Sequence, residues 1–456
     1  MGKRIIVVGG GPGGYAAAIK AAQLGAETIL FESGEIGGTC LNSGCIPTKA
    51  LLRTAGFYRS VAGNTIAGVK TTGVELDWPS VQSHKNDIVG RLTGGVGLLL
   101  RRNGVVIRRE KAVPLSGGSV RVGSETLTAD AVIMAVGSLS APLSFPGSEL
   151  PGVIDSKDAL SLERVPKSII IVGGGVIGVE FAALFSSLGV TTTVIEITPR
   201  LLPQMDAEIA EHIRSALMSD GVDIRTGARL LSAETAPEGL TACFDEGGKR
   251  SSVTAELLLV AAGRIPNTAG LGLGDIGVDM TRGAIKTDSY CRANIPGLYA
   301  VGDCNGKNML AHAAMAQGET AAGHIMGATQ NISHKYVPAC VYSCPEAASV
   351  GMTEDQAADS GLNYKIGRFD LNGNGRAVIE GAGGFVKIIA DKAYGEILGV
   401  HIAGPFATEL IAEAALCMCL EGTVEDIVGA IHAHPTIGES VREAAMSVFG
   451  KPIHGL

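Results

Sequence analysis

Near its N-terminus the 456-residue chain reads Ile5-Ile6-Val7-Val8-Gly9-Gly10-Gly11-Pro12-Gly13-Gly14. An Ala-rich segment follows up to Leu24-Gly25, and then a second apolar run that ends at Glu32. This order predicts a buried strand, a tight turn, a helix and a second strand. The first glycine permits the turn, the second lets the backbone approach a pyrophosphate, and the third lets the helix pack closely on the strand. We therefore expect a dinucleotide site, with the pyrophosphate at the helix N-terminus and a ribose hydroxyl on the acid, formed by Gly9, Gly11, Gly14 and Glu32.

The same unit occurs again 164 residues farther along the chain, from Ile5 to Ile169. It starts with Ile169-Ile170-Ile171-Val172, continues through a helical segment to Leu188-Gly189 and ends at Glu196. In both copies the acid lies 18 residues after the third glycine. A lone glycine pattern is a weak signal, but the complete unit occurring twice predicts two dinucleotide sites. The second site is assigned to Gly173, Gly175, Gly178 and Glu196.

Each unit is followed by a further apolar run that ends in glycine. Residues 129–136 lead to Gly137-Ser138, and residues 255–262 lead to Gly263. Doubly wound sheets bind their ligands at the carboxyl ends of the strands, so we expect these glycines at the edges that also hold the glycine-rich turns. A third apolar run, 298–301, ends in Gly302-Asp303.

The predicted fold class is α/β, with two doubly wound (Rossmann-like) dinucleotide-binding domains and a C-terminal α+β domain. The C-terminal domain is expected because alternating strands such as Gly384–Ile389 begin to appear after about residue 335. Proline-containing breaks at 142–151 and near 266 suggest the other boundaries. The expected division is residues 1–142 and 264–334 for the first dinucleotide domain, 143–263 for the second, and 335–456 for the C-terminal domain.

Composition narrows the range of partners. The formal net charge is −8 and the chain has no long run of Lys or Arg, which excludes a typical nucleic-acid surface. No apolar run approaches the ~18 residues that a membrane span needs, and the first residues do not follow a signal or transit pattern. We expect a cytoplasmic protein that binds neither membrane nor metal.

Two cysteines follow the first unit, in Gly37-Gly38-Thr39-Cys40-Leu41-Asn42-Ser43-Gly44-Cys45-Ile46-Pro47-Thr48-Lys49. Their spacing allows a small disulfide loop, for which Gly44 supplies backbone freedom. Pro47 is typical of a helix N-terminus, where the dipole would stabilise Cys45 as a thiolate. A structural disulfide is unusual in the cytosol and a zinc site would need a second pair of ligands, so a redox-active pair is favoured over both.

These motifs resemble the pyridine nucleotide–disulfide oxidoreductases over essentially the whole chain. The strings Cys40–Leu52, Met309–His312 and Tyr342–Thr353 are most similar to the dihydrolipoyl dehydrogenase branch of that family. The resemblance implies FAD on the first glycine unit, NAD(P) on the second, and a dimerisation domain at the C-terminus. It also implies that Cys40 exchanges with the substrate and that Cys45 faces the flavin.

The resemblance extends to single residues. Lys49 matches a lysine near the flavin ring, Glu180 of the nucleotide-binding unit matches its carboxylate partner, and Asp303 matches an aspartate on the ribityl chain. Glu196 favours NAD, since a carboxylate repels a 2′-phosphate, although Arg200 could be taken for a phosphate ligand. Further FAD contacts are expected from Gly38, Thr39, Gly137, Ser138, Met309, Leu310, Ala311 and His312, and a further NAD contact from Gly263.

A base is needed because only a thiolate attacks a disulfide, and an imidazole held by a carboxylate suits this role. In His432-Ala433-His434-Pro435-Thr436-Ile437-Gly438-Glu439 the family match assigns it to His434 with Glu439, and leaves His432 as a structural neighbour. In the family this pair comes from the other subunit, which implies a homodimer.

The implied activity is oxidation of dihydrolipoamide on a lipoyl-bearing carrier protein, from a 2-oxo acid dehydrogenase complex or the glycine cleavage system, with reduction of NAD⁺. Two alternatives remain: a disulfide reductase for another small thiol, and a non-catalytic FAD-bearing scaffold. No role follows for Cys340 or Cys344. Cys417 and Cys419 lie in an apolar helical segment and are expected as core or near-core thiols.

Overall fold

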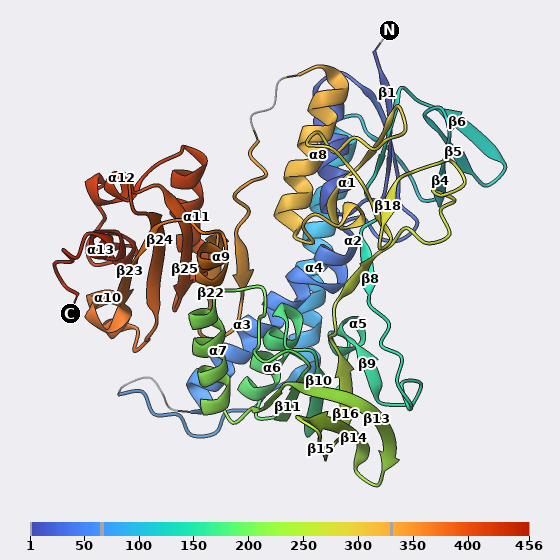
Figure 1. Ribbon diagram of the computed structural model, residues 1–456. Coiled ribbons are helices and arrows are strands. Elements are labelled where there is room, and N and C mark those ends of the chain that lie inside the picture. Colours follow the sequence, from blue (N-terminus) through green and yellow to red (C-terminus); the bar gives the residue numbers. More distant parts are fainter. Residues whose placement is uncertain (1, 64–67, 329–331, 456) are drawn as a thin grey trace.

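Two parallel sheets dominate the computed structural model, which describes residues 2–63, 68–328 and 332–455 (Figure 1). The first sheet has the strand order β20 (Leu298–Ala300), β7 (Ala131–Met134), β1 (Arg4–Val8), β2 (Glu27–Phe31) and β3 (Val106–Arg108). The second has the order β9 (Val153–Asp155), β16 (Leu257–Val260), β10 (Ser168–Val172), β11 (Thr191–Glu196) and β12 (Asp223–Thr226). The apolar runs form these strands because both faces of each sheet are covered, as in other parallel sheets.

The two sheets repeat one topology, as the duplicated sequence unit predicts. The strands of the two units, β1-β2 and β10-β11, lie at equivalent places, and β7 and β16 pair with β1 and β10 in the same parallel sense. The predicted runs that end in Gly137 and Gly263 are β7 and β16. The first sheet is completed by β20, a strand from beyond the second sheet, so the chain returns to its first domain after finishing the second.

Each parallel sheet carries a small antiparallel sheet at the same point of its topology, before β7 or before β16. These consist of β4 (Ala112–Leu115), β5 (Ser119–Val122) and β6 (Glu125–Thr128), and of β13 (Ala228–Ala236), β14 (Gly239–Glu246) and β15 (Lys249–Ala255). Two short antiparallel pairs complete this part, β8 (Ser138–Ser140) with β17 (Arg264–Pro266) and β18 (Met280–Thr281) with β19 (Ala284–Ile285).

Helices α1 (Pro12–Gln23) and α8 (Ala311–Met326) lie side by side on the first sheet (Figure 1). They approach closely because glycines face each other, since a Cβ added to Gly318 would stand 2.4 Å from the carbonyl oxygen of Gly13. The second sheet is accompanied by the short helix α5 (Ser156–Ala159) and by the longer helices α6 (Val176–Ser187) and α7 (Ala207–Ser219).

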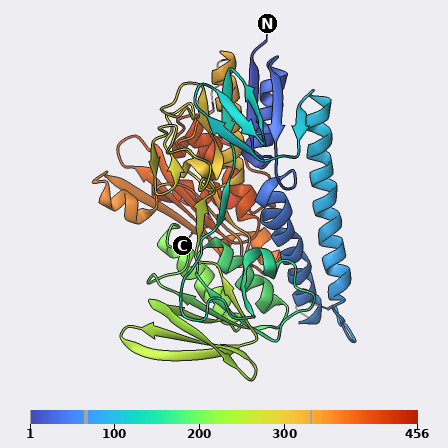
Figure 2. The same cartoon turned by 90° about the vertical axis from the view of Figure 1, so that its right-hand side faces the viewer.

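Three helices connect the first unit to the rest: α2 (Gly38–Ser43), α3 (Cys45–Ala62) and α4 (Trp78–Arg102). Helix α3 packs against both α4 and α6, so it runs from the cysteines toward the second domain. Figure 2 shows α4 as one long helix along the side of the molecule.

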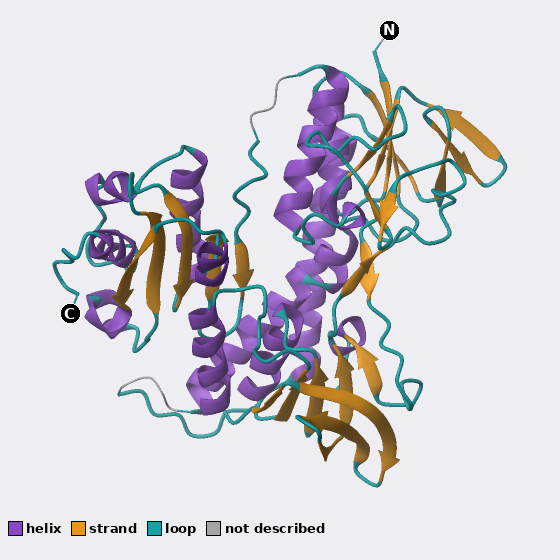
Figure 3. Ribbon diagram, viewed as in Figure 1, coloured by secondary structure: helices purple, strands orange, loops and turns teal. Residues whose placement is uncertain are grey.

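The C-terminal domain is an antiparallel sheet covered by helices (Figure 3). Its strand order is β21 (Ala339–Val341), β22 (Ala347–Gly351), β25 (Ile397–Ala403), β24 (Phe385–Asp391) and β23 (Tyr364–Asp370). Its helices are α9 (Glu354–Asp359), α10 (Gly375–Ile379), α11 (Ala407–Cys419), α12 (Val424–Gly429) and α13 (Glu439–Val448). Short 3₁₀ turns occur at Gly302–Asn305 and Leu371–Gly373.

Most of the predicted elements are present, with one error in burial. The strand expected at Gly384–Ile389 is β24, and the helix expected from Met309 begins at Ala311 because Leu310 is extended. Cys417 is partly buried, but Cys419 is exposed, so the prediction of a core or near-core thiol is wrong for Cys419. The buried stripe of α11 follows a helical period that ends on Met418, which turns the next residue outward.

Among the residues described, no helix is long and apolar enough to cross a membrane.

The contact between α13 and β23 depends on Gly367, where an added Cβ would stand 2.1 Å from the carbonyl oxygen of Ala444. We expect Gly367→Ala to lower the free energy of unfolding by about 2–3 kcal/mol, because neither backbone can yield without disturbing the packed helix. The matched control is Gly90→Ala in exposed α4, where an added Cβ meets nothing within 4 Å. It should stabilise by about 0.5–1 kcal/mol. Equal thermal midpoints for the two variants would contradict this assignment.

Candidate active site and dinucleotide sites

The glycine-rich turn after β1 is held by its own backbone and by Glu32. Gly9 has φ +107°, and an added Cβ would stand 2.2 Å from the carbonyl oxygen of Ala135. Gly14 lies so close to this turn that an added Cβ would stand 1.8 Å from the Gly9 carbonyl oxygen. The Glu32 carboxylate accepts the N–H groups of Gly10 and Gly34, both at 2.6 Å.

The turn after β10 has the same construction. Gly173 has φ +110°, and an added Cβ at Gly178 would stand 1.9 Å from the Gly173 carbonyl oxygen. Glu196 is buried and accepts the N–H of Gly174 at 2.5 Å and that of Thr198 at 2.6 Å. The first and third glycines of both units are therefore required by the fold itself.

The middle glycines are different. Gly11 and Gly175 have φ −71° and −73°, conformations that any residue can adopt. A Cβ at Gly175 would meet nothing within 4 Å, and at Gly11 it would meet only the Gly38 Cα at 3.8 Å. The protein's own packing therefore does not demand glycine here, whereas close approach of a pyrophosphate to the helix N-terminus does. The residues present fit two dinucleotides.

The cysteine segment is attached to the first glycine turn. The Gly37 N–H donates to the Gly10 carbonyl at 2.9 Å, and an added Cβ at Gly38 would stand 2.7 Å from the Gly11 Cα. Thr39 and Cys40 lie in α2, and Cys45 is the first residue of α3, two residues before the proline that predicted a helix start. The pair is thereby placed beside the first dinucleotide site.

Cys40 and Cys45 are partly buried free thiols whose sulfurs interact. A hydrogen bond from Cys40 lowers the pKa of Cys45 against the effect of burial, and the charge of Lys49 lowers it further. The same hydrogen bond, with burial, raises the pKa of Cys40. Of the two thiols, Cys45 at the N-terminus of α3 is therefore the one that loses its proton more readily.

Lys49 and Glu180 form an ion pair that links α3 to α6. The Lys49 ammonium lies 2.8 Å from both carboxylate oxygens of Glu180, which is only 4% exposed. Glu180 also accepts the N–H of Tyr342 at 3.1 Å, and the Lys49 ammonium stands 4.6 Å from the Tyr342 ring centroid. The structure thus brings together residues from all three domains next to the thiols.

A second polar cluster joins the ends of β7, β16 and β20. Ser138 donates to the Asp303 carboxylate. Arg264 donates to the Ser138 hydroxyl from Nε and to the Ser138 carbonyl from a terminal nitrogen, both at 2.8 Å. Gly137 has φ +69° and Gly263 φ +119°, and after them β8 and β17 pair with each other. The carboxyl edges of the two sheets therefore meet here.

The segment of Met309, Leu310, Ala311 and His312 forms the N-terminus of α8. The His312 ring nitrogen Nε2 lies 2.8 Å from the Pro338 carbonyl oxygen, at the entrance to the C-terminal domain. Met309 is 39% exposed. A helix N-terminus beside α1 is a suitable position for a negatively charged cofactor.

His434 and Glu439 form a pair, but far from the cysteines of the same chain. The His434 Nδ1 lies 2.9 Å from one Glu439 oxygen, and the Thr436 N–H donates to the other at 2.9 Å. Burial raises the pKa of Glu439, but these two contacts outweigh it and the pKa is lowered. His434 is 77% exposed, and α13 lies on the outer side of the C-terminal domain, away from α2 (Figure 1). His432 pairs with Glu413 instead, at 2.8 Å.

Arg200, the residue that left the choice between NAD and NADP open, is already engaged. Both of its terminal guanidinium nitrogens lie 3.0 Å from Asp355 Oδ2, in the C-terminal domain. Glu196, by contrast, contacts the glycine turn directly, through the Gly174 N–H.

Sequence reasoning missed three residues of this region. Arg264 directly follows Gly263, and Tyr342 begins the string 342–353 that resembles the family. Their partners, however, lie more than a hundred residues away in the sequence. Tyr15 lies near the thiols, since its pKa is raised by burial and by the charges of Cys40 and Cys45. The one available signal was the position of Arg264 directly after Gly263, equivalent to Ser138 after Gly137.

Comparison with known proteins agrees with this geometry. Residues 3–318 match the pyridine nucleotide-disulphide oxidoreductases, and residues 337–445 match the dimerisation domain of the same family. The chain belongs to the pyridine nucleotide-disulphide oxidoreductase family. The predicted family and fold class, and with them the oxidoreductase class and the cofactors FAD and NAD, are thereby confirmed.

Several relatives are similar over their whole length. A dihydrolipoyl dehydrogenase of Bacillus subtilis is 40% identical over 457 residues, covering 99% of both chains, and that of Geobacillus stearothermophilus is 40% identical over 98% of this chain and 97% of the relative. A mitochondrial dihydrolipoyl dehydrogenase of Pisum sativum is 38% identical over 99% of this chain and 92% of the relative.

Among solved structures, LpdA from Mycobacterium tuberculosis superposes with a TM-score of 0.89 at 27% identity, covering 97% of this chain and 99% of that one. The HOCl-induced flavoprotein disulfide reductase RclA from Escherichia coli superposes with a TM-score of 0.85 at 26% identity, covering 96% and 98%.

The middle glycine of the second unit provides a direct test. Gly175→Ala should raise the Kd for NADH by ~10-fold or more, because a hydrogen bond to a charged group contributes roughly 1.5–3 kcal/mol. Its thermal midpoint should equal that of the wild type, since the added methyl meets no protein atom. Calorimetric titration of NADH and a melting curve measure both quantities. Unchanged affinity would place the pyrophosphate elsewhere.

Proposed function

We propose that the protein is a dihydrolipoyl dehydrogenase that oxidises the dithiol of a protein-bound lipoyl group and passes the electrons through FAD to NAD⁺. The observation that carries this proposal is the Cys40–Cys45 pair, attached to the first glycine turn by the Gly37 N–H. Sequence identity of 40%, over nearly the whole length, to proteins of that name supports the choice of substrate. A redox pair that acts in catalysis also fits the cytoplasm as the compartment.

The dithiol step follows from the site residues. The His434 imidazole of the partner subunit accepts the proton of one substrate thiol, and Glu439 holds the ring by Nδ1 and stabilises its charged form. The substrate thiolate attacks Cys40 Sγ, and the Cys40–Cys45 bond breaks. Cys45 leaves as a thiolate, which Lys49 and the helix N-terminus stabilise.

His434 of the partner subunit gives the first proton to Cys40 Sγ and accepts the proton of the second substrate thiol. That thiolate then attacks the substrate sulfur of the mixed disulfide and displaces Cys40, which leaves as a thiol. The substrate is now a disulfide and the protein holds the reduced pair with its charge on Cys45, so two electrons have been transferred. Bound FAD supplies the two-electron carrier between this pair and NAD⁺. Glu196 selects NAD⁺ by accepting ribose hydroxyls, and the Arg200–Asp355 contact supports the same choice because it engages the nearby cation.

The assay that tests the proposal is NAD⁺-dependent oxidation of dihydrolipoamide. It is measured against reduced glutathione, which is a monothiol, and against other dithiols, with NADP⁺ as the alternative acceptor. We expect dihydrolipoamide and NAD⁺ to give the highest kcat/KM. The variant Cys45→Ser should abolish this turnover while NADH-dependent dye reduction through the flavin persists. Preference for another small thiol would favour a reductase of the kind named for RclA, and no turnover of any dithiol would favour a scaffold.

The dimeric site can be tested by mixing two inactive variants. Coexpressed Cys45→Ser and His434→Gln chains should recover about a quarter of the wild-type activity, because half the dimers are mixed and each has one intact site. The unfractionated mixture gives this value, whereas mixed dimers purified through two different tags should reach about half of the wild-type activity, and each homodimer is the control. If mixed dimers are as inactive as the homodimers, the pair acts within one chain.

A further inference from the structure

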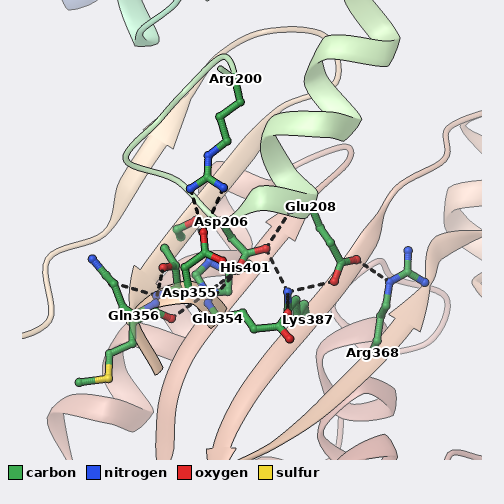
Figure 4. A network of polar contacts seen from close by, with 12 residues as sticks. Arg200, Asp206, Glu208, Glu354, Asp355, Gln356, Arg368, Lys387 and His401 are labelled. Atoms are coloured by element: carbon green, nitrogen blue, oxygen red, sulfur yellow. Dashed lines mark hydrogen bonds and ion pairs between the residues drawn. The ribbon is translucent and has the colours of Figure 1, made fainter. Parts of the chain in front are cut away.

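A lysine is buried between the second dinucleotide domain and the C-terminal domain. Lys387 lies on β24 and is 1% exposed. Its ammonium contacts three carboxylates, Asp206 at 3.1 Å, Glu208 at 2.9 Å and Glu354 at 2.5 Å. Figure 4 shows Lys387 between these acids.

The acids belong to elements of both domains. Asp206 is the N-cap of α7 in the nucleotide domain and Glu208 lies in the first turn of that helix, whereas Glu354 opens α9. Asp206 is 0% exposed and also accepts the N–H groups of Glu208 and Glu354, at 3.1 and 3.0 Å. Its hydrogen-bonding capacity is therefore filled from both sides of the domain boundary.

The cluster stays ionised. Burial lowers the pKa of Lys387, but hydrogen bonds to Glu354 and Glu208 outweigh this effect and the pKa is raised overall. Burial likewise opposes ionisation of Asp206, yet neighbouring His401, the Glu354 N–H and Lys387 lower its pKa. His401 is fully buried with its own pKa lowered by burial, and its ring nitrogens bind Ser349 and the Met352 carbonyl.

Asp206 ends a loop that begins at the ribose-binding acid. Residues 197–206 contain neither strand nor helix. The middle of the loop is attached to the glycine turn. The Leu202 N–H donates to the Gly174 carbonyl at 2.9 Å, and an added Cβ at Gly174 would stand 2.5 Å from the buried Leu201 side chain. Arg200 holds its middle to the C-terminal domain through Asp355 (Figure 4).

Stability alone does not explain this cluster. Replacing a buried ion pair by apolar residues of similar size is often neutral or stabilising, whereas removing one partner costs about 3–5 kcal/mol. These charges are distinguished by their position. They hold the end of loop 197–206 at Asp206, and the opposite end of this loop follows Glu196 in the dinucleotide site.

We propose that Lys387 is a positioning residue for NAD(H): by binding Asp206 it fixes the loop of residues 197–206, and with it Glu196 and the Gly173–Gly178 turn, against the C-terminal domain. The proposal rests on the proposed function of the second unit as the NAD site. Nothing in it involves the thiols, so it predicts a defect confined to the nucleotide half of the reaction.

The test uses the flavin-loaded dimer of Asp206→Asn/Lys387→Met, which removes both charges of the buried pair. Glu208 keeps its contact with Arg368 at 3.0 Å, and the Glu354 side chain is 40% exposed, so water can solvate it. We expect the Kd for NADH and the KM for NAD⁺ to rise about 5- to 10-fold, which corresponds to ~1 kcal/mol of lost positioning. The KM for dihydrolipoamide should stay within about twofold of the wild type. The matched control is Lys365→Met, which removes an exposed lysine from the neighbouring strand β23 and should change neither constant.

Asp355→Asn is the second variant, because it releases Arg200 at the surface without disturbing the buried acids. It should raise the Kd for NADH about 2- to 5-fold. Unchanged NADH affinity in a folded double variant, or in Asp355→Asn should the double variant fail to fold, would overturn the proposal. So would an equal change in both KM values. NADH binding is measured without a dithiol, so an error in the substrate would leave this result intact, whereas a wild type that bound no NADH would overturn both proposals.

Discussion

The hydrogen bond from the Gly37 N–H to the Gly10 carbonyl joins the two chemistries of this protein. It attaches the cysteine segment to the first glycine-rich turn, and the contact of Gly38 with Gly11 leaves no room for a side chain between them. The start of α3 at Cys45 is fixed as a consequence, and so is the direction in which this helix carries Lys49 toward Glu180. Because of this attachment, the two thiols and the first dinucleotide site are close in space as well as in sequence.

A duplicated unit gives the molecule its second dinucleotide site, and the two copies are joined rather than merely repeated. The segments after Gly137 and Gly263 pair as β8 and β17, and Arg264 from one copy binds Ser138 from the other. The carboxyl edges of both sheets therefore meet at this contact. Electron transfer between two nucleotide cofactors needs this proximity, and a duplication alone would not provide it.

Structural features that depend on a local sequence pattern could be predicted. Gly9, Gly14, Gly173 and Gly178 could be found because a turn and a close helix contact demand glycine within a few residues of the strand. Residues whose role depends on distant chain segments were found only where the family resemblance named them, as for Lys49 and Glu180. Lys387 reads as one polar residue in the strand Phe385–Asp391, and only the acids of α7 and α9 reveal it as a buried anchor. The predicted burial of Cys419 was wrong for a related reason, because the sequence of an apolar helix does not show which of its sides faces a core.

We propose that Cys40 and Cys45 exchange two electrons with the pyridine nucleotide bound on the second unit. Anaerobic titration of the air-oxidised, flavin-loaded protein with NADH, followed by acid quenching, alkylation and peptide mapping, tests it most directly. We expect newly alkylated thiols to appear only at Cys40 and Cys45, two for each NADH that delivers its electrons to the pair. Oxidation of NADH with no new thiol at either position would contradict it.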